Sequence, residues 1–421
     1  MRWAGLAAKG QELWDGGKAL LGDFRVLVIR ARGVAMTSDR LNSARRPRVR
    51  RLMLSDFRSY EALDLPMEED LVVLVGENGA GKTNLLEALS LFAPGRGLRR
   101  AEMADCARTG GPGGFAVSIS LEEDEDEPHS LGVGFEPSGE EAAPERRYRL
   151  DRAAASVQDF SERIRVIWLT PAMGGLFLGP ASERRRFLDR LVLTLDPRHG
   201  ARVGQFERAL RGRNRLLEEG KRADRWLDAI EREAAELGVA VAAARRECVE
   251  RLSANIARDR DETSPFPWAA IELHGDVERL ASEGPSLAAE ERYRALLAEN
   301  RDRDAAAGRT LIGPHLSDLA VFHGPKNVAA SKSSTGEQKA LLVGLTLAQA
   351  ALVAEMSGLA PVALFDELAA HFDPRRRAAL FDAVLKLGSQ VFVTGADPAV
   401  FADLEGRAGF YAVTPGRVAK T

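Results

Sequence analysis

Eight consecutive residues carry the clearest chemistry in the chain. Residues 76–83 have the sequence Gly-Glu-Asn-Gly-Ala-Gly-Lys-Thr and fit G-x-x-x-x-G-K-[ST], the pattern of a phosphate-binding loop. In such a loop, backbone N–H groups converge on phosphate oxygens, the lysine places a positive charge near the β- and γ-phosphates, and the threonine supplies a hydroxyl for Mg²⁺. The residues predicted to bind nucleotide are Gly76, Glu77, Asn78, Gly79, Ala80, Gly81, Lys82, Thr83 and Asn84.

A second chemical signal lies where an apolar run ends in two acids. Residues 362–365 are apolar and are followed by Asp366 and Glu367. If the run is a strand beside the phosphate loop, Asp366 holds Mg²⁺ through its waters and Glu367 orients or deprotonates the attacking water. Many strands end in acids, so this signal gains weight only from the loop. We predict Lys82 and Glu367 as catalytic residues, and Thr83 and Asp366 as metal-binding residues.

A third segment, residues 333–339, has two interpretations. Ser334 stands three residues before Glu337, which is the spacing of a capping box at the start of a helix. The same helix N-terminus can also bind a γ-phosphate that belongs to a second subunit. Both interpretations use the same physics, and the segment alone leaves them open.

Apolar patterning predicts the elements that position these residues. Leu71–Val75 is an uncharged apolar run and predicts a buried strand, whereas residues 84–92 have apolar side chains at helical spacing. A strand, a loop and a helix in this order place the loop at a helix N-terminus, where the dipole favours an anion. Further strands are predicted at residues 48–54, 63–65, 115–121, 131–135, 146–150, 164–169, 318–322, 361–365, 390–394 and 410–413, and a helix at residues 337–355.

The middle of the chain, residues 181–260, is predicted to be helical and is highly charged. Between Leu227 and Cys248, apolar residues alternate steps of three and four, which indicates a narrow seam with Cys248 as a small core residue. A second helix is predicted at residues 287–299, with a short strand at Ala269–His274 before it. The resulting prediction is an α/β head in two parts, 48–170 and 310–421, with an α-helical arm inserted at 171–309.

Composition bounds the class of protein. With 421 residues, 45% of them hydrophobic, the chain can form two or three domains of about 150 residues. Its formal net charge of −3 neither requires nor excludes nucleic acid. The two cysteines form no metal-like pair, which disfavours a zinc site and favours a reducing cytoplasm. We expect no apolar run long enough to cross a bilayer, and no membrane partner.

Residues 1–47 differ from the rest of the chain. They combine a weakly amphipathic start with a polar, arginine-rich stretch, and they contain no secretory signal. We predict a disordered or non-native extension, with the working chain beginning near Met36. The acidic stretch at residues 122–127 is predicted to be a solvated hairpin loop.

The order of the motifs resembles one group of ATPases. A phosphate loop, a helical insert, Ser-x-Gly-Glu-Gln and an apolar run with Asp-Glu follow one another in ABC-type ATPase heads, including the SMC/RecF branch. Residues 182–189 (Ser-Glu-Arg-Arg-Arg-Phe-Leu-Asp), 310–315 (Thr-Leu-Ile-Gly-Pro-His) and 54–60 resemble the RecF family in particular. The resemblance extends over nearly all of residues 48–394 and implies an ABC-type head split by a helical arm.

The resemblance also implies a function. ATP and Mg²⁺ would be the cofactors, and a homodimer would close on two ATP molecules, with Asp373 in a loop that contacts the partner and Thr394 at a switch position near the γ-phosphate. Family members bind duplex DNA next to single-stranded gaps and help RecO and RecR load RecA there, with slow ATP hydrolysis. The loop of one subunit would face five residues of the other, namely Ser334, Thr335, Gly336, Glu337 and Gln338.

The sequence departs from the family pattern at three places. The family commonly has Pro-Glu-Asp after the strand that ends near residue 169, whereas this chain has Pro-Ala-Met at residues 171–173. The glutamine that would contact Mg²⁺ is therefore not assigned, because the nearest one, Gln158, precedes that strand. His371 stands where the family usually has an acid, and Glu-Gln at residues 337–338 replaces two glutamines.

Arg184, Arg185 and Arg186 are predicted DNA contacts. Three successive residues fan over about 200° of a helix, so they do not all face one groove, and at least one is expected to pair with Glu183 or Asp189. Duplex binding through phosphates would depend steeply on salt. Two alternatives stay open: a transporter-associated ABC ATPase, which the long helical insert disfavours, and an SMC-like clamp in which hydrolysis acts only as a timer.

Overall fold

A computed structural model describes residues 44–421 of the chain, without residues 124–126, 138–144, 222–224, 262–263 and 369–371. Most of the predicted extension, including Met36, lies outside the described residues. His371 and the middle of the acidic stretch at residues 122–127 also lie outside them.

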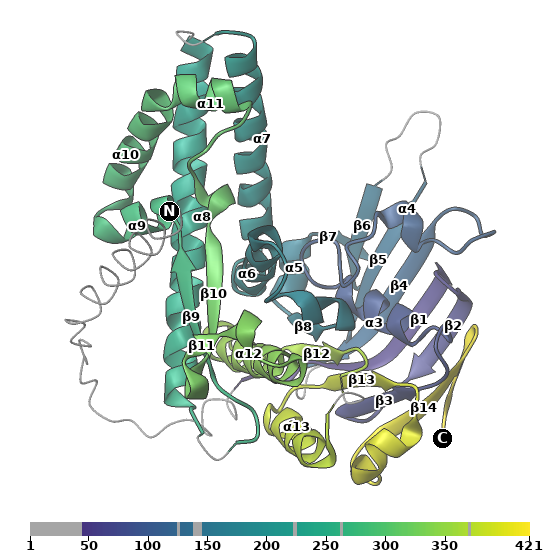
Figure 1. The fold of residues 1–421 in the computed structure, drawn as a ribbon. Helices are drawn as coiled ribbons and strands as arrows, with labels where there is room; N and C mark the ends of the chain where they lie inside the picture. Colours follow the sequence, from purple (N-terminus) through teal and green to yellow (C-terminus); the bar gives the residue numbers. More distant parts are fainter. Residues whose placement is uncertain (1–43, 124–126, 138–144, 222–224, 262–263, 369–371) are drawn as a thin grey trace, which may run out of the picture. The chain divides into compact units, whose positions relative to one another are not determined.

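A six-stranded sheet forms the centre of the head (Figure 1). In spatial order its strands are β15 (Arg417–Lys420), β14 (Gly409–Thr414), β3 (Leu71–Val75), β13 (Val391–Gly395), β12 (Val362–Phe365) and β8 (Val166–Leu169). All neighbours are parallel except β15, which pairs with β14 in the antiparallel sense. The carboxyl ends of β3, β13 and β12 therefore meet at one edge of the sheet.

Helices and a second sheet cover the two faces of this sheet. Leu71 and Val73 belong to a core that also holds α12 (Thr335–Ser357) and α13 (Pro374–Lys386). Val72 and Leu74 point the other way, into a core shared with α3 (Lys82–Ser90). Because both faces are buried, these strands appear in the sequence as continuous apolar runs.

The second sheet is antiparallel. Its strands, in spatial order, are β2 (Tyr60–Pro66), β1 (Arg48–Phe57), β4 (Phe115–Glu122), β5 (His129–Glu136), β6 (Glu145–Leu150) and β7 (Ala153–Ala155). Two short helices accompany it, α4 (Met103–Cys106) and α5 (Val157–Ser161). The buried amide of Gln390 joins it to the first sheet, since Gln390 bonds both the N–H and the carbonyl of Val49.

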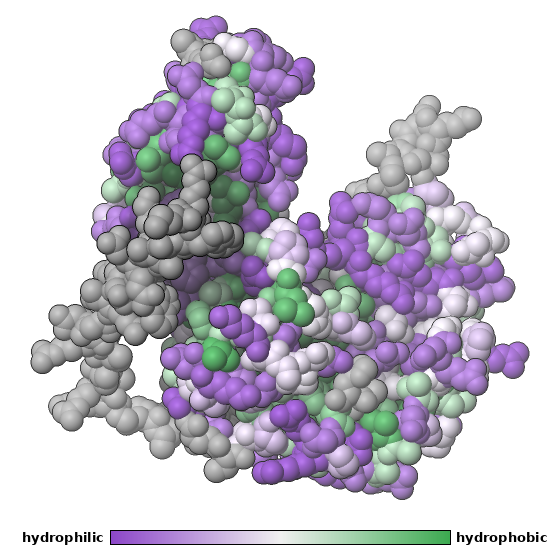
Figure 2. Space-filling model, viewed as in Figure 1, coloured by the Kyte–Doolittle hydropathy of each residue, from purple (hydrophilic) through white to green (hydrophobic). Residues whose placement is uncertain are grey.

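The inserted region is helical. Its helices are α6 (Ala181–Leu195), α7 (His199–Glu218), α8 (Arg225–Arg258), α9 (Asp276–Glu283), α10 (Ser286–Glu299) and α11 (Arg301–Ala307). The 34 residues of α8 span about 51 Å at 1.5 Å per residue, and α7, α9 and α10 pack against it. Figure 2 shows that hydrophilic side chains cover most of the upper end of this arm on the face in view.

The predicted short strand in the arm has partners that the sequence did not indicate. Strand β9 (Ala269–His274) pairs with β10 (Asp318–His323), which also pairs with β11 (Val328–Ala329). This three-stranded sheet joins chain segments on both sides of the predicted boundary at residue 309. Cys248 is buried in the core between α8 and the head, as predicted from the seam, and burial raises its pKa to about 12.

Helix α12 corrects one expectation about membranes. Its length and a mean hydropathy of 1.6 over an 18-residue window meet the requirements of a membrane span, although we expected no such run. Of that window, 61% is buried inside the protein, and Leu341 and Val353 belong to the head core. The helix is apolar because it is packed on several sides, which sequence hydropathy does not distinguish from lipid.

Several short elements were not predicted. Helix α13 begins at Asp373, whose carboxylate accepts a hydrogen bond from the N–H of Arg376, and Pro374 occupies the first helical position. Strands β7, β11 and β15 and helices α9 and α11 are short, so their patterning contains few apolar repeats. The predicted helical stretch at residues 181–260 is divided into α6, α7 and α8.

Candidate nucleotide site

The phosphate loop connects β3 to α3 and leaves the start of α3 open. Helix α3 has no side-chain cap and no acid in its first turn, so its first N–H groups have no competing side-chain acceptor. Gly81 precedes the helix with φ 110°, a left-handed conformation that favours glycine. A Cβ on Gly76 would lie 2.1 Å from the carbonyl oxygen of Val413. Both glycines are therefore required by the loop, which is shaped to receive an anion.

Lys82 is buried inside this loop. Its ammonium donates to the carbonyl oxygens of Gly76 at 2.7 Å and Glu77 at 2.9 Å. Neither acceptor is a carboxylate, so within the described part of the chain the positive charge is held over the loop without an anionic partner. Glu77, Asn78 and Gly79 form the exposed outer part of the loop.

The structure brings three predicted residues into direct contact beside the loop. The Thr83 hydroxyl lies 3.1 and 3.0 Å from the two carboxylate oxygens of Asp366, and the Thr394 hydroxyl donates to Asp366 at 2.8 Å. The Thr394 hydroxyl also accepts the N–H of Glu367 at 2.9 Å, which holds Glu367 in a left-handed conformation with φ 50°. Thr394 lies on β13, between the loop strand and the acidic strand, and thus contacts the carboxylate of Asp366 and the backbone of Glu367.

This donor set fits Mg²⁺. A hydroxyl and a carboxylate are hard oxygen donors, and Mg²⁺ is usually bound by one or two such groups together with waters and substrate phosphates. Thr83 and Asp366 would hold the ion, and among the described residues the buried carboxylate of Asp366 accepts hydrogen bonds only from the hydroxyls of Thr83 and Thr394. No glutamine occupies the segment after β8; the 3₁₀ turn Pro171–Gly175 stands there instead, and Gln158 lies on α5, before that strand.

The turn between β1 and β2 supports the loop from the side. The hydroxyl of Tyr60 donates to the carbonyl of Gly81 at 3.2 Å. Arg58, with φ 53°, donates two hydrogen bonds to the buried Glu87 of α3, at 2.8 and 2.6 Å. Asn84 donates to Ser59 and accepts from Arg99, so its side chain is already engaged within the protein. The family-like residues 54–60 therefore act by holding the phosphate loop in place.

The segment predicted to act on a partner subunit forms the start of α12. Ser334 and Glu337 make a reciprocal capping box, as the local pattern predicted. Glu337 also pairs with Lys326, and this pair together with Ser334 lowers the pKa of Glu337 to about 2. Ser334 and Thr335 are exposed, whereas Gln338 is buried and donates to the carbonyl of Ser333 at 2.8 Å. The exposed pair is accessible to a second molecule.

Two of the three predicted DNA arginines are engaged within the protein. Arg184 forms a bidentate pair with Asp318, at 2.7 and 2.9 Å, so the carboxylate partner is neither Glu183 nor Asp189. Arg185 donates to the carbonyl of Ser317 at 2.6 Å. Arg186 is exposed. DNA contact stays a prediction for all three, and Arg186 is the most exposed of them.

The other two segments that resemble the RecF family, residues 182–189 and 310–315, lie close together where the arm joins the head. Asp189 accepts two hydrogen bonds from Arg245, at 2.7 and 2.8 Å, and lies 2.8 Å from His199; Arg245 in turn donates to the carbonyl of Pro314. Burial opposes ionisation of Asp189, but His199 and Arg245 outweigh it and lower the pKa to about 2. Glycine is required at position 313 on two grounds: its φ of 144° strains any other residue, and a Cβ there would lie 2.3 Å from the Tyr293 hydroxyl. These two segments therefore stabilise the contact between the arm and the head.

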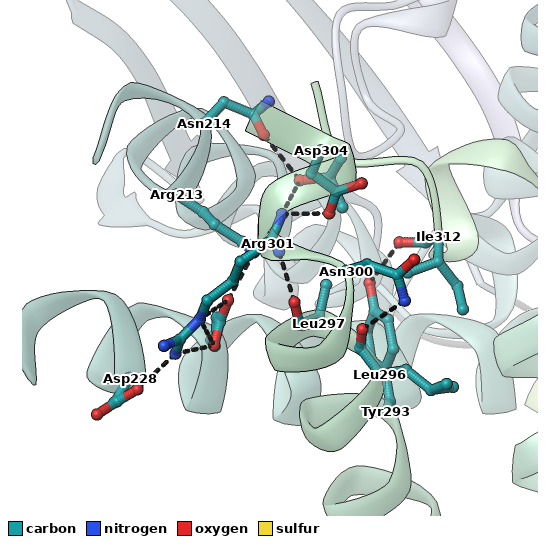
Figure 3. A network of polar contacts seen from close by, with 12 residues as sticks. Arg213, Asn214, Asp228, Tyr293, Leu296, Leu297, Asn300, Arg301, Asp304 and Ile312 are labelled. Atoms are coloured by element: carbon teal, nitrogen blue, oxygen red, sulfur yellow. Dashed lines mark hydrogen bonds and ion pairs between the residues drawn. The ribbon is translucent and has the colours of Figure 1, made fainter. Parts of the chain in front are cut away.

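Arg213 forms the centre of a second polar network, higher in the arm (Figure 3). It donates to Glu231 at 3.0 Å, Asp304 at 2.7 Å and the Thr310 hydroxyl at 2.8 Å. A further bond goes to the carbonyl of Leu297 at 2.7 Å. Arg213 is fully buried, and the network ties α7, α8 and α10 to the segment that leads back to the head.

Comparisons with known proteins agree with this architecture. A family model described as RecF/RecN/SMC N terminal domain matches residues 48–418. The chain is 54% identical over 374 residues to the DNA replication and repair protein RecF of Mesorhizobium japonicum, covering 89% of this chain and 98% of that protein. It is also 54% identical over 369 residues to the same protein of Rhizobium meliloti, covering 87% and 97%.

A solved structure has a similar fold. The structure of the recombination mediator protein RecF-ATPrS in the RecFOR pathway matches with a TM-score of 0.77 and 20% identity, covering 90% of this chain and 99% of that one. The fold class predicted from the sequence, an ATPase head with an inserted helical arm, is confirmed.

Proposed function

The chain belongs to the RecF family of DNA replication and repair proteins, and from this premise we propose that it is a cytoplasmic, ATP-dependent DNA-binding protein that dimerises at gaps in DNA and promotes RecA loading with RecO and RecR. The observation that carries the proposal is the contact of Thr83, Asp366 and Thr394 beside a phosphate loop whose helix, α3, has no side-chain cap. The family assignment leaves the transporter alternative without support.

ATP is proposed to lie with its phosphates over the loop between β3 and α3. The N–H groups of α3 and the Lys82 ammonium stabilise the phosphate charge, and Thr83 and Asp366 hold Mg²⁺. Bound there, Mg²⁺ would supply positive charge that offsets the negative charge of the phosphate oxygens. Glu367 orients or deprotonates the attacking water, and the hydrogen bond that its N–H donates to the Thr394 hydroxyl fixes its backbone.

A second copy of the chain is proposed to complete the site. Ser334 and Thr335 are exposed at a helix N-terminus and can face the γ-phosphate held by the loop of a partner. The exposed Asp373, at the start of α13, is proposed to contact the same partner. Turnover is proposed to be slow and DNA-stimulated, with ATP binding and dimerisation as the main event.

Sedimentation with and without ATP, and then with gapped DNA, tests the proposal. We expect a monomer without ATP, a dimer with ATP and co-sedimentation of the dimer with DNA. Lys82→Ala should abolish ATP-induced dimerisation, whereas Ser334→Arg should still bind ATP but stay monomeric, because the bulk lies at the interface. A Lys82→Ala protein that dimerises with ATP contradicts the model, and Glu367→Gln with unchanged hydrolysis removes Glu367 from its role.

A further inference from the structure

A cavity of about 440 Å³ lies beside the metal end of the nucleotide site. Thr83 and Asp366 line one end of it, but none of residues 76–82 does, so it adjoins the phosphate loop without being part of it. Since a water molecule takes about 30 Å³ in the liquid, the cavity has room for a small anion together with hydration water.

Arginines dominate the charged lining of this cavity. Arg100 follows α3, and Arg186 and Arg190 lie one turn apart on the same face of α6. Within the described residues, none of these three guanidiniums has a carboxylate partner at ion-pair distance. Arg99 also lines the cavity but is paired with Glu87. The acids in the lining are Glu183, at the exposed rim, and Asp366.

Arg190 is the least exposed of the three arginines. Its guanidinium lies 5.1 Å from the ring of Trp168 and 5.2 Å from the ring of Phe187, and it donates to the sulfur of Met173. Burial and the charge of Arg100 lower the pKa of Arg190 to about 9, and burial and Arg186 lower that of Arg100. Arg190 lies against apolar side chains, and the exposed Arg100 and Arg186 add like charge beside it, so an anion bound among the three would offset this repulsion.

The anion is identified by the position of the cavity. In the hydrolysis that we propose, the water oxygen bonds to the γ-phosphorus as the bond to the bridging oxygen breaks, so ADP and inorganic phosphate form. We infer that the cavity lined by Arg100, Arg186 and Arg190 binds this inorganic phosphate as it leaves the site through the gap between α6 and the segment after α3. A planar guanidinium fork matches phosphate oxygens in two-point hydrogen bonds.

This inference rests on the proposed function, and the first experiment separates the two. A non-hydrolysable ATP analogue with Mg²⁺ fills the nucleotide site, and inorganic phosphate is titrated at constant ionic strength while Trp168 fluorescence is followed, with Trp168→Phe to assign the signal. We expect a saturable change whose apparent affinity falls at least tenfold in Arg186→Met and Arg190→Met. Arg211→Met, which removes an exposed arginine of α7, is the matched control and should bind as the unaltered protein does.

Single-turnover kinetics give the second readout. In Arg190→Met we expect bond cleavage, measured by acid quench, at the unaltered rate, and phosphate release, measured with a fluorescent phosphate reporter, at least tenfold slower. Arg190→Lys should restore part of the release rate. If the unaltered protein does not cleave ATP, the proposed function fails; if it does, but phosphate affinity and release are unchanged in both variants, only the inference fails.

Two further outcomes overturn the inference. Loss of bond cleavage in Arg190→Met would assign the arginine to the chemical step. A fluorescence change produced by duplex DNA, and not by inorganic phosphate, would assign the cavity to the DNA backbone. Arg186 is exposed, so the affinity of Arg186→Met decides the question even if Arg190→Met does not fold.

Discussion

Arginine is used in opposite ways in the arm and beside the nucleotide site. Arg213 in the arm is fully buried, and its donors meet two carboxylates, a hydroxyl and a carbonyl (Figure 3). Arg190, beside the nucleotide site, meets aromatic rings and a sulfur, and no carboxylate among the residues that the structure describes. Satisfied donors fix a fold, because removing them leaves buried charge; unsatisfied donors at a cavity are available to a ligand. Substitutions in the two regions should therefore affect different measurements.

The largest effect is expected from Arg213→Met. The substitution leaves Asp304 buried without its cation, whereas Glu231 keeps Arg301, so we expect the free energy of unfolding to fall by about 3–5 kcal/mol. Urea denaturation measures this loss. Arg211→Met, on the exposed side of the same helix, should change stability by no more than about 0.5 kcal/mol. Equal stability of the two variants would show that the network does not hold the arm.

Asp366→Asn should lower ATP turnover and leave stability nearly unchanged, the opposite of Arg213→Met. Asparagine keeps the size and an acceptor for Thr394, but it removes the charge that holds Mg²⁺, so we expect turnover to fall by about 100-fold with little change in stability. ATP hydrolysis measured against Mg²⁺ concentration tests this, with Asp64→Asn on β2 as an exposed control. An unchanged Mg²⁺ dependence would exclude Asp366 as a metal-binding residue.

The contacts of Asp189 between the arm and the head should make the stability of the protein depend on pH. Its pKa of about 2 lies below the ordinary value of about 3.9, so its contribution to stability is fully present above about pH 5 and is lost as the pH falls through 2. The difference in unfolding free energy between the unaltered protein and Asp189→Asn should therefore shrink by about 2 kcal/mol between pH 5 and pH 2. Denaturant titrations at several pH values measure it, and a constant difference would contradict the assignment.

The parts of the site that local pattern determines were predictable from the sequence. The phosphate loop, its strand and the capping box at Ser334 each depend on residues close together in the chain. The sequence also supplied Asp366 as a partner of the loop. Thr394 was predicted only from the family resemblance. Its role depends on β13 lying between β3 and β12, and the order of strands in a sheet cannot be inferred from any one segment of the sequence.

The residues that the sequence did not identify act across long distances in the chain. Arg100 and Arg190 belong to different elements and meet only because α6 packs beside the segment after α3. A glycine- and arginine-rich stretch at residues 95–100, directly after the loop helix, was the one local signal. Arg184 and Arg185 show the same limit: their partners, Asp318 and the carbonyl of Ser317, lie more than a hundred residues later, so no local pattern indicated that these arginines are engaged within the protein.

The last comparison distinguishes a helix cap from a binding residue. Ser334→Ala and Ser156→Ala each remove one capping box, on α12 and α5, and each should cost about 1 kcal/mol in unfolding free energy. Of these two serines, only Ser334 is proposed to face the γ-phosphate that a partner subunit holds. ATP-induced dimerisation, measured by sedimentation, should therefore weaken in Ser334→Ala and stay unchanged in Ser156→Ala. If both variants dimerise alike, Ser334 is only a helix cap, and closure of the dimer must depend on other residues at the start of α12.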